Sequence, residues 1–412
     1  MVYDLIATIC QNNENEAKNV SFEEAAQLFS LFFDEPSFSD CDLDCISSFF
    51  PFRRFFDFLE NSKKTNEKCD VMIPLILTCI SHASSGKYFI VNEIIQEKDI
   101  IFLINSLENS SITSSAFYMI ANICRENDSF IHLLFNNHIF EILSKISMNC
   151  QISNFLAFLS KSELNEFESF ALLDFIVFEF NSFFVSIDEV HNEIQNEIDT
   201  IVDIIEILYT FMHSSIENVS LKAFQMSSDL ILPKIDLLFN FDNLELIHEL
   251  LKLLFLLPIL PNSLIPILFK LYKTNDENII ITCSKIFEKQ FNNWKNETLI
   301  DTDVLFSILL SKFPSSFNCE KVLFLTLMRY ANFTQICMPE MIALLIKFVT
   351  YQNYSIMCLR ALYKIATMGN NIDEMFGDLL DEALFALQEV ANSEKEDIAM
   401  EAQIVLDALT VK

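Results

Sequence analysis

Apolar residues recur along most of the chain with the spacing of amphipathic helices, and these helices come in pairs joined by a short polar turn. In residues 383–409, for example, Ile398, Ala402, Val405 and Leu409 are spaced four, three and four apart, which places them on one helix face. The same pairing is read in residues 100–127, 201–231, 264–291, 304–333 and 341–369, and more faintly in 138–164. A single pair cannot bury its apolar face alone, so the repetition predicts stacked pairs in a solenoid.

The spacing of the polar turns predicts the repeat length and the domain plan. The turns centre near Ser110, Asn149, Ser215, Asn275, Ser316, Asn353 and Ser393, and four of the six intervals are close to 40 residues. The two longer intervals leave room for an extra helix pair or an irregular insert near 163–200 and 240–262. We therefore predict a helical cap over 1–70, repeats over 71–377 and a C-terminal cap repeat over 378–412.

The same pattern indicates an all-α protein. A second apolar stripe, Ala116, Ile120, Ile123 and Cys124, also has helical spacing. No segment alternates with period two for long enough to build a sheet, and the β-branched run at 279–282 keeps helical phasing. The predicted fold is a right-handed superhelical solenoid of helical repeats.

Glycine is nearly absent, and this excludes several kinds of catalytic site. The chain has three glycines, Gly86, Gly369 and Gly377, whereas a dinucleotide fingerprint, a phosphate loop and a nucleophile elbow each need at least two close together. We expect no enzyme activity and no cofactor. Left-handed turn positions are expected at asparagines instead, at 136–137 and 292–293.

Cysteine and histidine spacing gives no sign of a metal site. The eleven cysteines are scattered and odd in number, which is typical of reduced thiols in a cytoplasmic or nuclear protein. Cys41 and Cys45 have no second pair nearby, and no histidine has a zinc-binding spacing.

No secretory signal opens the chain, and the apolar stretch 253–269 is interrupted by three prolines, so a membrane span is disfavoured. The short patch 50–56, FPFRRFF, is interpreted as a junction that packs the N-terminal cap onto the repeats.

Negative charge is concentrated in three zones. The formal net charge is −31, and residues 19–52, 162–221 and 365–394 contain no Lys or Arg but seven, thirteen and seven acids. Such blocks favour a basic protein or peptide partner and disfavour nucleic acid and acidic membrane surfaces. The alternative is that these acids keep a very hydrophobic solenoid soluble.

Residues 114–146, SSAFYMIANICRENDSFIHLLFNNHIFEILSKI, resemble a repeat of the armadillo family, in which a helix, a turn, a short helix and a longer helix follow in order. Within it, Tyr118 and Asn122 are similar to the tryptophan-x-x-x-asparagine signature of importin-alpha, which occurs once in this chain. The resemblance implies that Asn122 holds the backbone of an extended peptide and that Tyr118 packs on a lysine stem. Glu126 and Asp128 would then be acids for a basic peptide. The alternative for Asn122 is a polar helix residue whose hydrogen bonds are satisfied internally.

The function predicted from the sequence is a non-enzymatic protein-binding scaffold or adaptor. Its concave face would hold a basic or extended protein segment, in an armadillo/HEAT-type solenoid located in the cytoplasm, the nucleus or both. Two alternatives remain open: a divergent importin-alpha-like nuclear import adaptor, and a HEAT-like structural subunit of a larger complex.

Overall fold

The computed structural model describes residues 95–108, 113–146, 150–187, 194–241, 243–294, 302–313, 315–368 and 372–410, together with Arg53, Phe56, Asp57, Leu77 and Ile80. Every regular element in these ranges is a helix. The chain divides into two compact units, Met1–Lys234 and Ile235–Lys412. The predicted boundaries at 70 and 377 stay predictions, and nearly all of the predicted 1–70 cap lies outside the described residues, as do Cys41 and Cys45.

The described helices of the first unit begin at residue 97. They are α7 (Glu97–Ser106), α8 (Thr113–Glu126), α9 (Ser129–Asn136), α10 (Ile139–Leu143), α11 (Cys150–Ser160), α12 (Glu166–Ile187), α13 (Ile194–Met212) and α14 (Glu217–Met226). The last of these continues through a π-helical turn, η1 (Ser227–Ile231), into a short 3-10 helix, η2 (Leu232–Lys234).

The second unit is built in the same way. Its helices are α15 (Ile235–Asn240), α16 (Leu244–Leu256), α17 (Leu264–Leu271), α18 (Glu277–Trp294), α19 (Thr302–Leu310), α20 (Phe317–Tyr330), α21 (Phe333–Ile336), α22 (Pro339–Val349), α23 (Ser355–Met368), α24 (Ile372–Phe376), the 3-10 turn η3 (Gly377–Leu379), α25 (Leu380–Ala391) and α26 (Glu396–Thr410).

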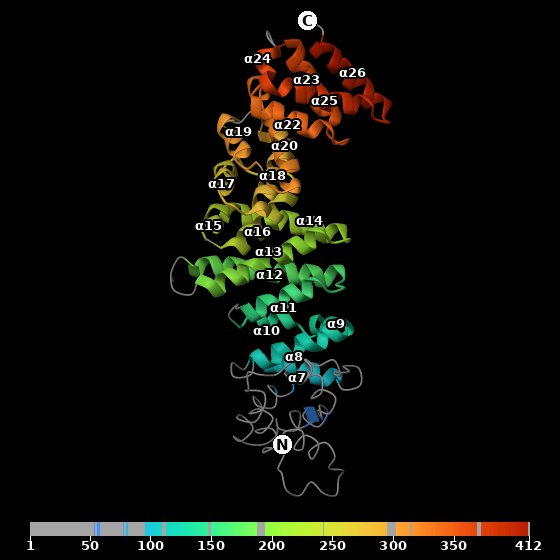
Figure 1. The fold of residues 1–412 in the computed structure, drawn as a ribbon. Helices are drawn as coiled ribbons and strands as arrows, with labels where there is room; N and C mark the ends of the chain where they lie inside the picture. The colour runs from blue at the N-terminus through green and yellow to red at the C-terminus, as the bar shows by residue number, and fades with distance from the viewer. Residues whose placement is uncertain are drawn as a thin grey trace, which may run out of the picture. The chain divides into compact units, whose positions relative to one another are not determined.

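Within each unit, helices that are separated in sequence stack on one another (Figure 1). In the first unit α8 packs on α11 and α11 packs on α13, and in the second unit α16 packs on α18 and α18 packs on α20. Hairpins such as α13–α14, α22–α23 and α25–α26 supply the paired helices. This arrangement buries an apolar face that no single pair could cover, and it confirms the predicted all-α solenoid.

The helix faces predicted from apolar spacing are the buried ones. Ala116, Ile120, Ile123 and Cys124 on α8 are completely buried, and the stripe on α26 from Ile398 to Leu409 is also in the core. The polar turns predicted near 215, 275, 316, 353 and 393 all fall between helices, whereas those near 110 and 149 lie outside the described residues. The β-branched run at 279–282 is part of α18, as predicted.

The two long intervals between turns are also helical where the structure describes them. The 22-residue helix α12 occupies most of 163–200, and α16 occupies most of 240–262. The apolar stretch 253–269 is divided between the end of α16 and α17, with a non-helical segment between them. Among the described helices, none is both long enough and apolar enough to cross a membrane.

The predicted asparagine turns are wrong in position. The left-handed residue at the α9–α10 junction is His138, with φ of 55°, and not Asn136 or Asn137. Asn292 and Asn293 lie inside the last turn of α18. Asparagine tolerates the left-handed conformation but does not impose it, so packing decides which residue of a junction adopts it.

An aromatic cluster forms much of the core around α18. The ring of Phe287 lies 5.5–5.8 Å, centroid to centroid, from the rings of Phe269, Tyr272, Trp294 and Tyr330. Phe287, Tyr272 and Trp294 have no exposed surface. These side chains come from three helices, α17, α18 and α20, and the residue that follows α17, so the cluster ties consecutive repeats together.

A candidate protein-binding groove between α8 and α11

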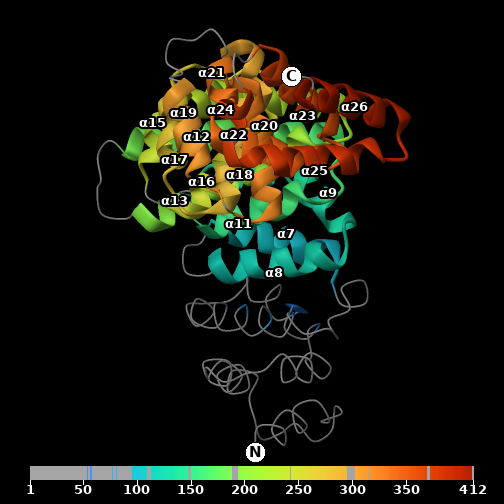
Figure 2. The same cartoon turned by 45° about the horizontal axis from the view of Figure 1, so that its top comes forward.

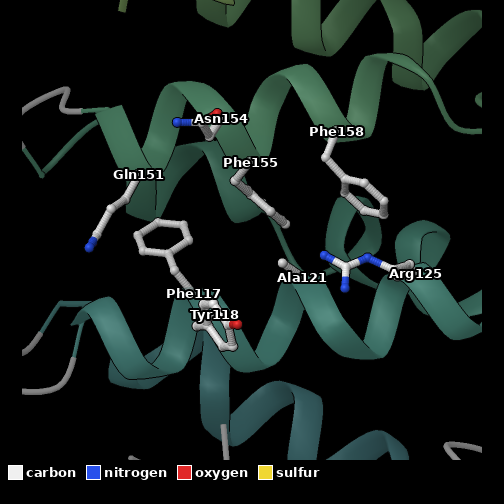
Figure 3. A pocket seen from close by; sticks show the side chains of 8 residues that line it. All are labelled: Phe117, Tyr118, Ala121, Arg125, Gln151, Asn154, Phe155 and Phe158. Carbon is white, nitrogen blue, oxygen red and sulfur yellow. The ribbon is translucent and has the colours of Figure 1, made fainter. Parts of the chain in front are cut away.

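A pocket of about 360 Å³ lies where α8 packs against α11. Its lining is Phe117, Tyr118, Ala121 and Arg125 from α8 with Gln151, Asn154, Phe155 and Phe158 from α11 (Figure 3). Both sets have helical spacing, so each helix presents one continuous face to the pocket. We call this pocket the α8–α11 groove.

The floor of the groove is aromatic and the rim is polar. Phe117 and Phe155 are 3% and 4% exposed, and their rings are 5.6 Å apart, tilted by 59°. Gln151 and Asn154 are exposed at one side. An apolar floor with a few polar groups at its edge is typical of a ligand or peptide site.

Arg125 supplies a cation at the opposite end of the groove. Its side chain is exposed, and its Nη1 donates a long hydrogen bond of 3.4 Å to Oδ1 of Asn122. In Figure 3 the guanidinium points back along α8 toward Ala121. No carboxylate in the part of the chain that the structure describes forms an ion pair with Arg125. The guanidinium can therefore receive a polar or acidic group of a ligand.

The residues predicted from the sequence are only partly brought together at this groove. Tyr118 lines it and is 52% exposed, whereas the Asn122 side chain is 4% exposed and accepts the hydrogen bond from Arg125. Asp128 is exposed just before α9, and the Glu126 side chain lies outside the described residues. Peptide binding by these four residues stays a prediction.

Sequence reasoning missed most of the groove. Arg125 could have been found, because it lies seven residues after Tyr118 and so shares its helix face. The α11 residues could not have been found, because only the packing of α11 on α8 brings them beside Tyr118.

Acids of the 162–221 block are used in contacts within the first unit. Glu168 is 4% exposed; one of its carboxylate oxygens lies 2.7 Å from Nδ1 of His132, and the other accepts from the backbone N–H of Asn165. Two further acids form ion pairs across helices, Asp174 with Lys222 and Glu206 with Lys161. At least three acids of this block therefore contact basic or histidine side chains from other parts of the first unit.

Asp203 is a half-buried acid of this block whose pKa is shifted. Burial raises the pKa of Asp203 from 3.8 to about 6, partly opposed by the hydrogen bond that Ser153 Oγ donates to its carboxylate. Because the pKa of Asp203 is higher in the folded than in the unfolded chain, the folded chain holds the Asp203 proton more tightly. The protonated carboxyl therefore contributes fully to stability below about pH 4, and this contribution is lost as the pH rises through about 6.

We therefore expect Asp203→Asn to change the pH dependence of unfolding. The wild-type chain should lose more stability than the variant between pH 4 and pH 7, measured by urea denaturation followed by circular dichroism. Glu163→Gln, at an exposed acid of the same block, serves as the control and should keep the wild-type trend. Parallel curves for the wild type and Asp203→Asn would contradict this assignment.

Comparison with protein-family models gives no match, and comparison with curated proteins also gives none. Solved structures include a similar chain, from work on the phosphorylation switch that controls the interaction between cadherin and beta-catenin. Its TM-score is 0.48 at 11% sequence identity, covering 99% of this chain and 99% of that chain. A similarity of this size carries no argument about function, so the solenoid assignment rests on the helices themselves.

Proposed function

We propose that this chain is a non-enzymatic protein-binding scaffold whose α8–α11 groove holds an extended segment of a partner protein. The observation that carries the proposal is the groove itself, an aromatic floor open to the surface with amide groups at one side and a guanidinium at the other. Repeated helix pairs provide a rigid surface on which such a site is displayed.

The groove chemistry defines the segment that fits. An apolar or aromatic side chain would lie on Phe117 and Phe155, and amide groups of Gln151 and Asn154 would hydrogen-bond the backbone of the segment. Arg125 would bind an acidic or hydrogen-bonding side chain beside it and would repel a lysine. The segment is therefore expected to pair an apolar residue with a carboxylate or amide.

Peptides selected from a random library on the full chain should show this pattern and should depend on Arg125. For such a peptide, Arg125→Glu should weaken binding by about tenfold to a hundredfold, because a hydrogen bond to a charged group contributes about 1.5–3 kcal/mol. The measurement is fluorescence anisotropy of the labelled peptide.

Arg360→Glu is the matched control, because Arg360 is exposed on α23 of the second unit and the charge change is the same. Equal losses in the two variants would mean that only the net charge matters and would reject the groove as the binding site.

The more specific alternative, an importin-alpha-like adaptor in an armadillo-type solenoid that enters the nucleus, is supported by the exposed Tyr118 ring. The burial of Asn122 and the nearby Arg125 disfavour capture of a lysine in the present arrangement. Salt-sensitive binding of a lysine-rich peptide that is lost in Asn122→Ala, with nuclear accumulation of a fluorescent fusion, would favour this alternative. A HEAT-like subunit role would instead show as a stable complex that withstands high salt.

A further inference from the structure

Three large apolar side chains are exposed on one helical hairpin of the second unit. Phe385 on α25 is 72% exposed, and Met400 and Ile404 on α26 are 62% and 43% exposed. The two helices pack side by side (Figure 1 and Figure 2). Met400 and Ile404 are one turn apart on the same face of α26, while Val405 is completely buried against the core. Singly exposed apolar residues are normal, whereas neighbouring exposed apolar side chains give a partner an apolar area to cover.

This hairpin is also the most acidic part of the second unit. Residues 380–410, which span both helices, contain eight acids and one base, Lys395. The acids flank the apolar side chains at a distance of one helical turn. Asp381 and Glu389 lie on either side of Phe385, and Glu396 precedes Met400. We call the apolar residues and these flanking acids the α25–α26 surface.

The acids here differ from those of the first unit in what they contact. In the 162–221 block, acids pair with Lys161, Lys222 and His132. No acid of α25 or α26 forms an ion pair with a Lys, Arg or His among the described residues. Their charge is therefore directed to solvent and is available to a partner.

We propose that the α25–α26 surface docks a basic amphipathic helix of a partner protein. The apolar stripe of such a helix would cover Met400, Ile404 and Phe385, and lysine or arginine residues beside the stripe would meet the flanking acids. A second copy of the chain would place acids against acids, and an anionic membrane would be repelled for the same reason. Charge complementarity thus selects a basic protein partner. This surface lies in the other unit from the α8–α11 groove, so the two proposals are independent.

The test uses the full chain and a fluorescein-labelled model peptide of leucine and lysine in an amphipathic helical register. The peptide should bind, and its affinity should fall as salt is added, because exposed charges are screened. The double variant Met400→Ser/Ile404→Ser should lower affinity by about tenfold through loss of buried apolar area. The control Leu221→Ser/Leu244→Ser, at two leucines that are each 59% exposed elsewhere, should bind as the wild type does.

Charge and specificity are tested separately. Neutralising Asp381, Glu389 and Glu396 to the matching amides should weaken binding more than neutralising the exposed Glu163, Glu217 and Glu245. Equal losses in the two sets, or equal binding of a peptide with the same composition in scrambled order, would overturn the proposal. A dimer in sedimentation experiments that dissociates in Met400→Ser/Ile404→Ser would also overturn it, because the surface would then be a contact between copies.

Discussion

Replacing Phe287 by alanine is expected to destabilise the second unit by about 3–5 kcal/mol, the range for a fully buried phenylalanine. Phe287 contacts four other aromatic rings from neighbouring repeats, so its removal leaves a cavity that each of them borders. These four rings are attached to different helices that are themselves packed in the core, which limits how far the cavity can collapse.

The measurement can be confined to this unit, because Trp294 is the single tryptophan of the chain and its ring lies 5.5 Å from that of Phe287. Urea denaturation followed by tryptophan fluorescence therefore reports on the affected core. Phe385→Ala is the matched control, since Phe385 is 72% exposed in the same unit and its loss leaves no cavity. Similar midpoints for the two variants would show that the aromatic cluster does not hold the repeats together.

The helical architecture could be predicted because a buried stripe is a local property of the sequence. The apolar residues of α8 and α26 have helical spacing, and the same residues are buried in the structure. The polar turns are local as well, which explains why those in the described ranges fall between helices.

The details of the junctions depend on packing and were predicted less well. α18 continues through Asn292 and Asn293 to Trp294, which is completely buried and whose Nε1 donates to the carbonyl oxygen of Leu260 at 3.4 Å. Burial of this large side chain holds the last turn of the helix although asparagine is a poor helix former. The sequence around residue 292 does not reveal the contact between Trp294 and Leu260, which lies 34 residues earlier in the chain.

The candidate site shows the same division between local and tertiary information. The seven-residue spacing of Tyr118 and Arg125 in the sequence already places them on one helix face. Phe155 and Phe158 join them only because α11 stacks on α8. The acids of the 162–221 block also differ from those of α25 and α26. Lys222 and Lys161 neutralise part of one block through contacts across helices, and composition cannot distinguish such acids from those directed to solvent.

Replacing Arg53 by alanine is expected to destabilise the first unit by about 2 kcal/mol or more, because Asp99 is a completely buried carboxylate. Arg53 donates two hydrogen bonds to it, from Nη1 at 2.5 Å and from Nη2 at 3.0 Å, across 46 residues of sequence. Asp99 also accepts from the backbone N–H of Gln96, which caps α7. The Asp99 carboxylate raises the pKa of Arg53. The Arg53–Asp99 contact joins the 50–56 patch to α7, as expected for a junction between the predicted cap and the repeats.

The effect should be local to the start of the described helices. Hydrogen exchange of α7 should become faster in Arg53→Ala, and the circular dichroism transition should move to lower urea concentration. Lys145→Ala is the control, because Lys145 pairs with Glu108 in the same unit but both side chains are exposed, so the variant should behave as the wild type does. Unchanged exchange in α7 would mean that Arg53 does not hold Asp99, and the junction assigned to 50–56 would then lose its support.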